Sequence, residues 1–139
     1  MMQDYQSQKS IVLDILDAHQ SMPGNLLPIL HGIQDTLGYI PSAAVEDIAK
    51  ALNLSKAEVH GVISFYHHFR RQAPGQYLVQ LCRAGACQSM NARALEEFVR
   101  GALRLNFGGT TPDGRVTLES VYCLGNCACA PAMMVNGEL

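Results

Sequence analysis

The sequence lacks a large excess of charge of either sign. Ten lysine and arginine residues stand against twelve aspartate and glutamate residues, which gives a formal net charge of −2. Arg70 and Arg71 form the only adjacent basic pair in the sequence. Proteins that bind nucleic acids or anionic membrane surfaces usually present clustered basic residues. The composition therefore argues against both kinds of partner.

Long hydrophobic runs are also missing, although 48% of the residues are hydrophobic, as in an ordinary globular chain. No apolar segment approaches the roughly twenty residues that a membrane-spanning helix needs. The first ten residues, MMQDYQSQKS, lack the basic and then apolar layout of a secretory signal peptide. We therefore expect a cytoplasmic protein without membrane insertion.

Cysteine is absent from the first 81 residues, and all five cysteines fall in two short stretches. These are LCRAGACQSM at 81–90 and YCLGNCACAPAMM at 122–134. An odd number of cysteines confined to one half of the chain fits poorly with the disulfide framework of a secreted domain. In a reducing compartment such clusters more often bind metal or take part in redox chemistry.

The sequence before the first cysteine predicts helices. Apolar residues recur every three or four positions in IVLDILDAH (11–19) and LPILHGIQDTLG (27–38), and Gly38 can end a helix in the left-handed conformation. A further helix is expected from Pro41, and the capping box of Ser55 and Glu58 predicts the start of another. The residues expected to point inward from that last helix are Val59, Val62, Ile63 and Tyr66.

The RRQAPG segment interrupts the helical pattern with Pro74 and Gly75. We therefore expect a helical domain at 1–72 and a second domain at 73–139. In the second domain, QYLVQL (76–81) predicts a strand that leads into Cys82, and MNARALEEFVRGALRL (90–105) predicts a helix. Its apolar stripe, which would cover a sheet, consists of Leu95, Phe98, Val99, Ala102 and Leu103.

Two more strands are expected after this helix. VTLESVYC (116–123) again ends on a cysteine, and AMMVNGEL (132–139) leads into an Asn136-Gly137 hairpin turn. The order strand, helix, strand and hairpin indicates a small α/β lobe with its cysteine loops at one end of the sheet, which is where such sheets bind ligands.

The spacing of the cysteines narrows their chemistry. Four residues separate Cys82 from Cys87, and three separate Cys123 from Cys127. Four converging thiolates favour zinc or an iron-sulfur cluster over hard cations. Zinc ribbons usually have two residues between the cysteines of a pair, and so does a thioredoxin-type dithiol, whereas a [2Fe-2S] cluster accepts wider loops. The spacing therefore favours a [2Fe-2S] cluster, with a zinc-stabilised interaction module and a stand-alone dithiol oxidoreductase as alternatives.

The remaining thiol, Cys129, is expected not to bind metal, because four sulfurs complete two tetrahedral irons. An exchange of ligand between Cys127 and Cys129 stays open. Small residues such as Gly85 and Gly125 would let backbone amides approach the sulfurs.

The motifs LLPILHGIQDTLGYIP, LNLSKAEVHGVISFYHHF, CRAGAC and CLGNCACAPAMMVNG resemble those of a known family along nearly the whole chain. This is the family of thioredoxin-like [2Fe-2S] subunits that partner an FMN- and NAD-binding subunit in respiratory complex I, NAD-reducing hydrogenases and NAD-dependent formate dehydrogenases. The resemblance implies a helical bundle followed by a thioredoxin-like α/β [2Fe-2S] ferredoxin lobe. It places the four cluster ligands on Cys82, Cys87, Cys123 and Cys127.

Within the family, Arg83 and the QSM run at 88–90 look most like the γ subunit of the cytoplasmic NAD-dependent formate dehydrogenase. The resemblance then implies a non-catalytic subunit that exchanges single electrons with FMN on the NAD-binding β subunit, while a molybdopterin- and Fe-S-containing α subunit oxidises formate. The equivalent subunit of complex I or of an NAD-reducing hydrogenase is the alternative. Relatives continue past the Asn-Gly turn with a strand and usually a helix, so we expect those elements to be missing after Leu139.

Overall fold

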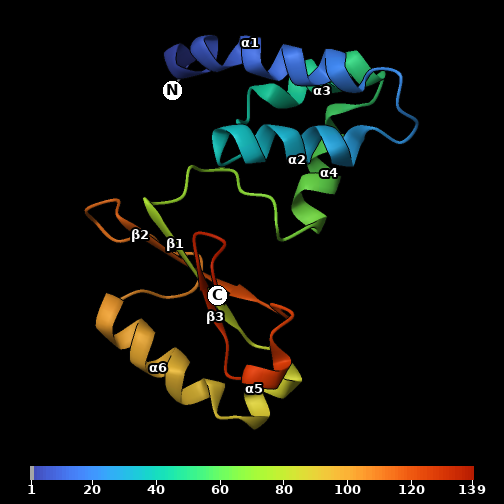
Figure 1. Ribbon diagram of the computed structural model, residues 1–139. Coiled ribbons are helices and arrows are strands. Elements are labelled where there is room, and N and C mark those ends of the chain that lie inside the picture. Colours follow the sequence, from blue (N-terminus) through green and yellow to red (C-terminus); the bar gives the residue numbers. More distant parts are fainter. Residues whose placement is uncertain (1) are drawn as a thin grey trace. The chain divides into compact units, whose positions relative to one another are not determined.

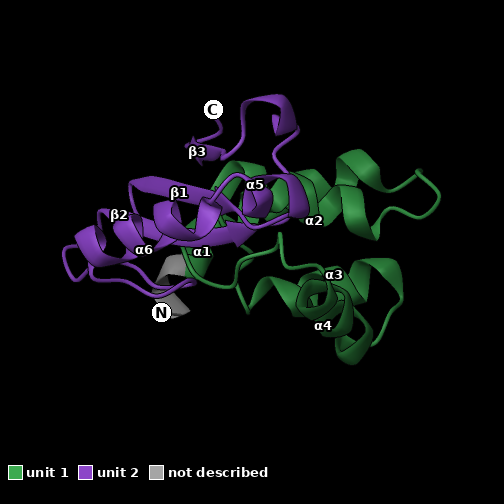
Figure 2. Ribbon diagram, turned by 90° about the horizontal axis from the view of Figure 1, so that it is seen from below, with its two compact units in different colours: residues 1–73 green, residues 74–139 purple. Residues whose placement is uncertain are grey.

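The computed structural model describes residues 2–139, and the chain divides into two compact units (Figure 2). One unit comprises residues 1–73 and the other residues 74–139. The division falls at the Ala73-Pro74 bond, one residue after the boundary expected from the RRQAPG segment. Within the described residues, none of the helices combines the length and apolar character needed to cross a lipid bilayer.

The first unit is helical, as predicted (Figure 1). Its elements are α1 (Met2–His19), α2 (Leu26–Leu37), α3 (Ala44–Leu52) and α4 (Lys56–Phe65). Gly38 ends α2 with φ of 83°, and its N–H donates to the carbonyl oxygen of Gln34 at 2.7 Å. Ser55 and Glu58 form the predicted capping box, in which each side chain accepts a hydrogen bond from the backbone N–H of the other residue. These local signals therefore determine where the helices begin and end.

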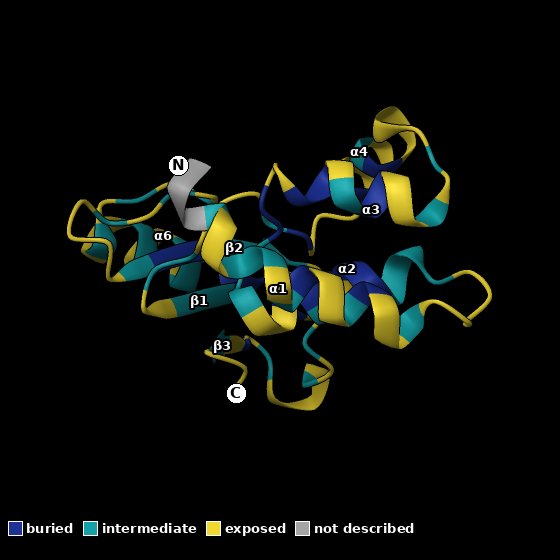
Figure 3. Cartoon of the chain, turned by 90° about the horizontal axis from the view of Figure 1, so that it is seen from above, coloured by how far each residue is buried: buried dark blue, intermediate teal, exposed yellow. Residues whose placement is uncertain are grey.

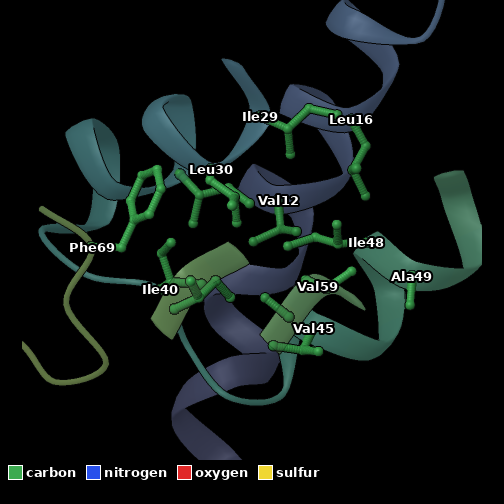
Figure 4. Packing of buried hydrophobic residues seen from close by; sticks show 13 residues of the cluster. Val12, Leu16, Ile29, Leu30, Ile40, Val45, Ile48, Ala49, Val59 and Phe69 are labelled. Carbon is green, nitrogen blue, oxygen red and sulfur yellow. The ribbon is translucent and has the colours of Figure 1, made fainter. Parts of the chain in front are cut away.

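The core of this unit is built from aliphatic side chains of all four helices (Figure 4). Ile29, Leu30, Ile33 and Ile48 are each fully buried, and Figure 3 shows the buried segments of α2 and α3 in dark blue. Fully burying one such side chain stabilises a fold by roughly 1.5–3 kcal/mol. The prediction for α4 is confirmed for Val59 and Ile63. It is wrong for Tyr66, which follows the helix in an extended conformation and is 42% exposed.

The second unit is a small α/β lobe, as predicted. Its elements are β1 (Tyr77–Cys82), α5 (Gly85–Ser89), α6 (Ala92–Leu103), β2 (Val116–Val121), the 3-10 turn η1 (Cys127–Cys129) and β3 (Met133–Val135). The strand order is β2-β1-β3, with β1 parallel to β2 and antiparallel to β3. The one-turn helix α5 was not predicted from the sequence; it follows the end of β1 and contains Cys87.

The hairpin after β3 forms at the predicted residues. Asn136 and Gly137 have φ of 50° and 85°, which are the two left-handed positions of a type I′ turn. The Asn136 side-chain oxygen also accepts a hydrogen bond from the backbone N–H of Leu78 at 2.7 Å. The backbone N–H of Asn136 donates to the Leu78 carbonyl at 3.0 Å. The turn residue thus ties β3 to β1.

The predicted apolar stripe of α6 is only partly used. Leu95, Val99 and Leu103, spaced by four residues, are half-buried, whereas Phe98 is 73% exposed and Ala102 is also exposed. The face of α6 that packs inward is therefore narrower than the predicted stripe, because residues spaced by four positions already fill it.

Candidate metal centre

The two strands that lead into the cysteine loops are parallel neighbours. Cys82 is the last residue of β1, and its partner in the register is Val121, the last residue of β2. Cys123 follows two residues later. Because parallel strands have their carboxyl ends at the same end of a sheet, both loops begin side by side. Figure 1 shows α5 and the 127–129 turn at this end of the lobe.

The first cysteine pair is buried. Cys82 and Cys87 are 4% and 1% exposed and pack with Ala92 and Ala132. A hydrogen bond with Cys82, together with burial, raises the pKa of the Cys87 thiol, and the backbone N–H of Ala132 acts in the opposite direction. Cys82 is itself tied to this segment, because its N–H donates to the Ala132 carbonyl at 3.1 Å.

The second pair is exposed to solvent. The sulfur atoms of Cys123 and Cys127 lie 3.8 Å apart, and the N–H of Gly125 donates to Cys123 Sγ at 3.3 Å. Cys123 has φ of 149°, a backbone conformation that residues other than glycine rarely adopt. The loop therefore holds this sulfur in place with backbone geometry as well as with a hydrogen bond.

The two pairs influence each other electrostatically. The pKa of Cys127 is raised by its hydrogen bond with Cys123 and by the charge of that thiolate, with further contributions from Cys87 and Cys82. The charge of Cys123 in turn contributes to the raised pKa of Cys87. Thiolates that repel one another in this way become stable together only when cations bind between them.

Within residues 2–139, no group of three or more His, Cys, Asp or Glu side chains is arranged to hold one metal ion. The thiols instead form two pairs, Cys82 with Cys87 and Cys123 with Cys127. A two-iron cluster requires two thiolates at each iron, so this arrangement suits it.

Cys129 lies at the end of the 3-10 turn that begins with Cys127, and its thiol is exposed. Its N–H donates to the Asn126 carbonyl at 3.0 Å. Cys129 is not among the thiols whose charges raise the pKa of Cys127, which are Cys123, Cys87 and Cys82.

The sequence of residues 12–139 matches the family described as thioredoxin-like [2Fe-2S] ferredoxin. The chain belongs to this family. Membership agrees with the resemblance seen in the sequence motifs and with the α/β lobe of residues 74–139. The cofactor of a thioredoxin-like [2Fe-2S] ferredoxin is the [2Fe-2S] cluster, so the cofactor predicted from the cysteine spacing is confirmed.

Curated relatives of this thioredoxin-like ferredoxin are subunits of larger enzymes. It is 32% identical over 128 residues to the NADP-reducing hydrogenase subunit HndA of Solidesulfovibrio fructosivorans, covering 92% of this chain and 75% of the relative. It is 34% identical over 113 residues to NADH-quinone oxidoreductase subunit 2 of Thermus thermophilus, covering 81% and 62%. It is 36% identical over 125 residues to an NADH-quinone oxidoreductase subunit of Mycobacterium tuberculosis, covering 90% and 50%.

A solved structure with the same fold is a chain of an NAD+-reducing [NiFe]-hydrogenase in the H2-reduced state. The TM-score is 0.68 at 26% sequence identity, and the match covers 81% of this chain and 19% of the hydrogenase chain. The chain thus spans between half and three quarters of its curated relatives, and a much smaller part of this longer neighbour.

The residues at the sheet end fit a [2Fe-2S] cluster. Thiolate sulfur is the ligand that iron-sulfur clusters use, and the N–H groups of Gly125 and Ala132 lie against sulfur atoms of both pairs. Gly125 was expected in this role from the sequence, whereas Ala132 was missed. No pattern around it signals the role, because it arises from the return of the chain beside β1.

Proposed function

We propose that this chain is an electron-transfer subunit in which Cys82, Cys87, Cys123 and Cys127 hold the [2Fe-2S] cluster. The observation that carries the proposal is the convergence of these four thiols at the ends of two parallel strands. A cluster bound there supplies reversible transfer of single electrons. The chain needs no acid, base or nucleophile of its own for this role, which makes it a non-catalytic subunit of an oxidoreductase complex.

The residues around the four thiols would have different roles when the cluster is bound. Cys82 and Cys87 lie in a packed, buried environment that excludes water from one side. The N–H groups of Gly125 and Ala132 donate toward sulfur, which stabilises negative charge there. Cys123 and Cys127 are exposed, so a redox partner can approach from their side.

The partner in this proposal is a subunit that carries FMN and binds NAD. Among the complexes in which the family serves, Arg83 and the QSM run at 88–90 favour the γ subunit of the cytoplasmic NAD-dependent formate dehydrogenase. The chain would then exchange electrons with FMN of the β subunit, and a molybdopterin-bearing α subunit would oxidise formate.

A second candidate is the equivalent subunit of an NADH-quinone oxidoreductase or of an NAD(P)-reducing hydrogenase. It is favoured by the names of the relatives and of the structural neighbour. The two candidates share the cluster and the flavin partner, and they differ in the subunit that supplies or receives the electrons.

The helical domain at 1–72 serves in this proposal as the docking part of the chain. It holds no cysteine, and it presents two neighbouring aromatic rings, Phe65 at 75% and Tyr66 at 42% exposure, whose centroids lie 5.0 Å apart. Exposed aromatic residues are enriched at protein-protein interfaces.

The ligand set is tested with the full chain purified without oxygen. We expect brown protein with iron and acid-labile sulfide in equal amounts and a rhombic electron paramagnetic resonance signal after dithionite reduction. Cys127→Ser should bleach the protein, whereas Cys129→Ser should leave its absorbance unchanged. The reverse result would make Cys129 the fourth ligand, and colourless protein that holds zinc would overturn the proposal.

The parent complex is tested by purifying a tagged chain with its natural partners. We expect subunits that contain FMN and molybdopterin, together with formate-dependent reduction of NAD. Reduction of NAD by hydrogen, or of a quinone by NADH, in the same preparation would favour the second candidate.

A further inference from the structure

Arg83 is the charged residue that directly follows a predicted cluster ligand, Cys82. Its backbone is fixed at the end of the sheet, because its N–H donates to the Val121 carbonyl at 2.8 Å. Since arginine stays protonated at any pH that a folded protein tolerates, the residue that directly follows Cys82 carries a permanent positive charge.

The side chain of Arg83 is held by residues of α6 and of the loop that follows it. Its Nε donates to Glu96 Oε2 at 3.1 Å, and its guanidinium carbon lies 5.1 Å from the centroid of the Phe107 ring. The Glu96 side chain is only 12% exposed. A charge-assisted hydrogen bond combined with stacking on an aromatic ring fixes a guanidinium better than either contact alone.

The single carboxylate of Glu96 cannot neutralise the two guanidinium groups that contact it. Arg100 also reaches Glu96, with Nη1 at 3.7 Å from Oε1, and it lies over the same Phe107 ring at 5.8 Å. Within the described part of the chain, the buried Nε of Arg100 has no hydrogen-bond partner. Two guanidiniums therefore share one carboxylate, which leaves a net charge of one positive.

The surroundings do not cancel that charge. Arg83, Glu96 and Arg100 line an open hollow of about 530 Å³. The other charged residues that line it are Arg93 and Glu97, and their charges are opposite. The hollow as a whole therefore keeps a net positive charge beside the cysteine loops.

We propose that Arg83, positioned by Glu96, raises the reduction potential of the [2Fe-2S] cluster. This inference rests on the proposed ligand set. Reduction adds one electron without forming or breaking a bond, so the cluster and its four thiolates become more negative by one charge. A fixed positive charge nearby stabilises the reduced form more than the oxidised form, and net charge is one of the determinants of iron-sulfur potentials. Arg83 acts through its charge without binding metal, and Glu96, which holds the guanidinium, is the positioning residue.

The proposal predicts shifts of opposite sign for the two partners. Arg83→Gln removes a positive charge and should lower the ratio of reduced to oxidised cluster at a fixed potential by roughly threefold. That is about 30 mV at 59 mV per tenfold for one electron. Glu96→Gln removes the offsetting negative charge and should raise the ratio. The double variant restores a net charge of one positive, so its potential should return toward that of the wild type.

The experiment is a redox titration of the full holoprotein, followed by the electron paramagnetic resonance signal of the reduced cluster. Arg115→Gln is the matched control, because Arg115 immediately precedes β2 at the end of the sheet away from the cysteines. A six-residue strand separates it from that end by about 20 Å. At that distance its charge is screened by salt, so the midpoint should not move.

The results separate the inference from the function on which it rests. Wild-type protein without a [2Fe-2S] signal would sink the proposed ligand set. A wild-type signal with the same midpoint in Arg83→Gln and Glu96→Gln would overturn the role of Arg83 and leave the ligand set intact. Shifts of the same sign in both variants would indicate a loosened loop rather than a charge effect, and would also overturn it. If Arg83→Gln does not fold, the charge effect is judged from two other variants. The midpoint of Glu96→Gln should rise, and that of Arg83→Lys, which keeps the positive charge, should stay near the wild-type value.

Discussion

Gln34 is a buried polar residue of α2, and both ends of its side-chain amide bind the segment that follows α4. It is 3% exposed. Its Nε2 donates to the carbonyl oxygen of His68 at 2.7 Å, and its Oε1 accepts from the N–H of Arg70 at 2.7 Å. The same segment places Phe69 in the helical core. Gln34→Met keeps nearly the same length and volume but removes both hydrogen bonds.

The expected loss of stability follows from these two bonds. Each is worth roughly 0.5–1.5 kcal/mol, and a partner that stays desolvated adds about 1–3 kcal/mol. His68 is exposed and Arg70 half-buried, so water can replace part of what is lost. We therefore expect Gln34→Met to lower the free energy of unfolding of the helical unit by about 2–3 kcal/mol. For a unit of 73 residues this lowers Tm by roughly 10–15 °C.

The assay is urea unfolding of the full chain, followed by far-UV circular dichroism. Gln6→Met is the control, because Gln6 is an exposed residue of α1 and its replacement should change stability by less than about 0.5 kcal/mol. Iron content should be the same in both variants, since all the cysteines lie in the other unit. If Gln34→Met unfolds at the same urea concentration as Gln6→Met, the amide does not hold this segment and the reasoning fails.

Two further predictions concern stability. Gly75→Ala should destabilise residues 74–139 by about 1–3 kcal/mol, because a Cβ there would lie 2.8 Å from the carbonyl carbon of Arg115; Gly61→Ala, in open space on α4, should instead stabilise by up to about 1 kcal/mol. Thermal unfolding compares the two, and equal Tm values would contradict the clash. Ser55→Ala should cost about 1 kcal/mol at neutral pH. The backbone and side-chain hydrogen bonds from Ser55 lower the pKa of Glu58 below its ordinary 4.5, and alanine keeps the backbone bond. The part of the cost that comes from the 2.8 Å bond between the Ser55 hydroxyl and Glu58 Oε2 is therefore present above that pH and is lost as pH falls through the folded pKa. A cost of Ser55→Ala that did not shrink in acid would contradict it.

Local sequence signals predicted the helical unit well, because they act within a few residues. The left-handed Gly38 and the capping box of Ser55 and Glu58 need no distant partner. The misplacement of Tyr66 has the opposite origin. Helical periodicity continues through it, but the chain turns extended so that the segment up to Phe69 can pack against α2.

The position of the thiols at one end of the sheet was predictable from the sequence, whereas the environment of each thiol was not. Alternating and helical patterns showed that Cys82 and Cys123 follow strands, and a parallel pair brings such positions together. Which pair is buried depends on tertiary packing, and so do the contact of Ala132 with Cys87 and the exposure of Phe98. These features arise where segments distant in sequence come into contact, so no local sequence pattern predicts them.

The parallel pairing of β1 and β2 also decides where the polypeptide enters its second unit. Pro74 and Gly75 lead into β1 at the strand end opposite Cys82, beside Arg115. The covalent tether between the two units is therefore attached about 20 Å of strand away from the sulfur atoms. Changes in the length or sequence of that tether therefore act first on strand ends that carry no thiol, and leave the geometry of the cysteine loops unchanged.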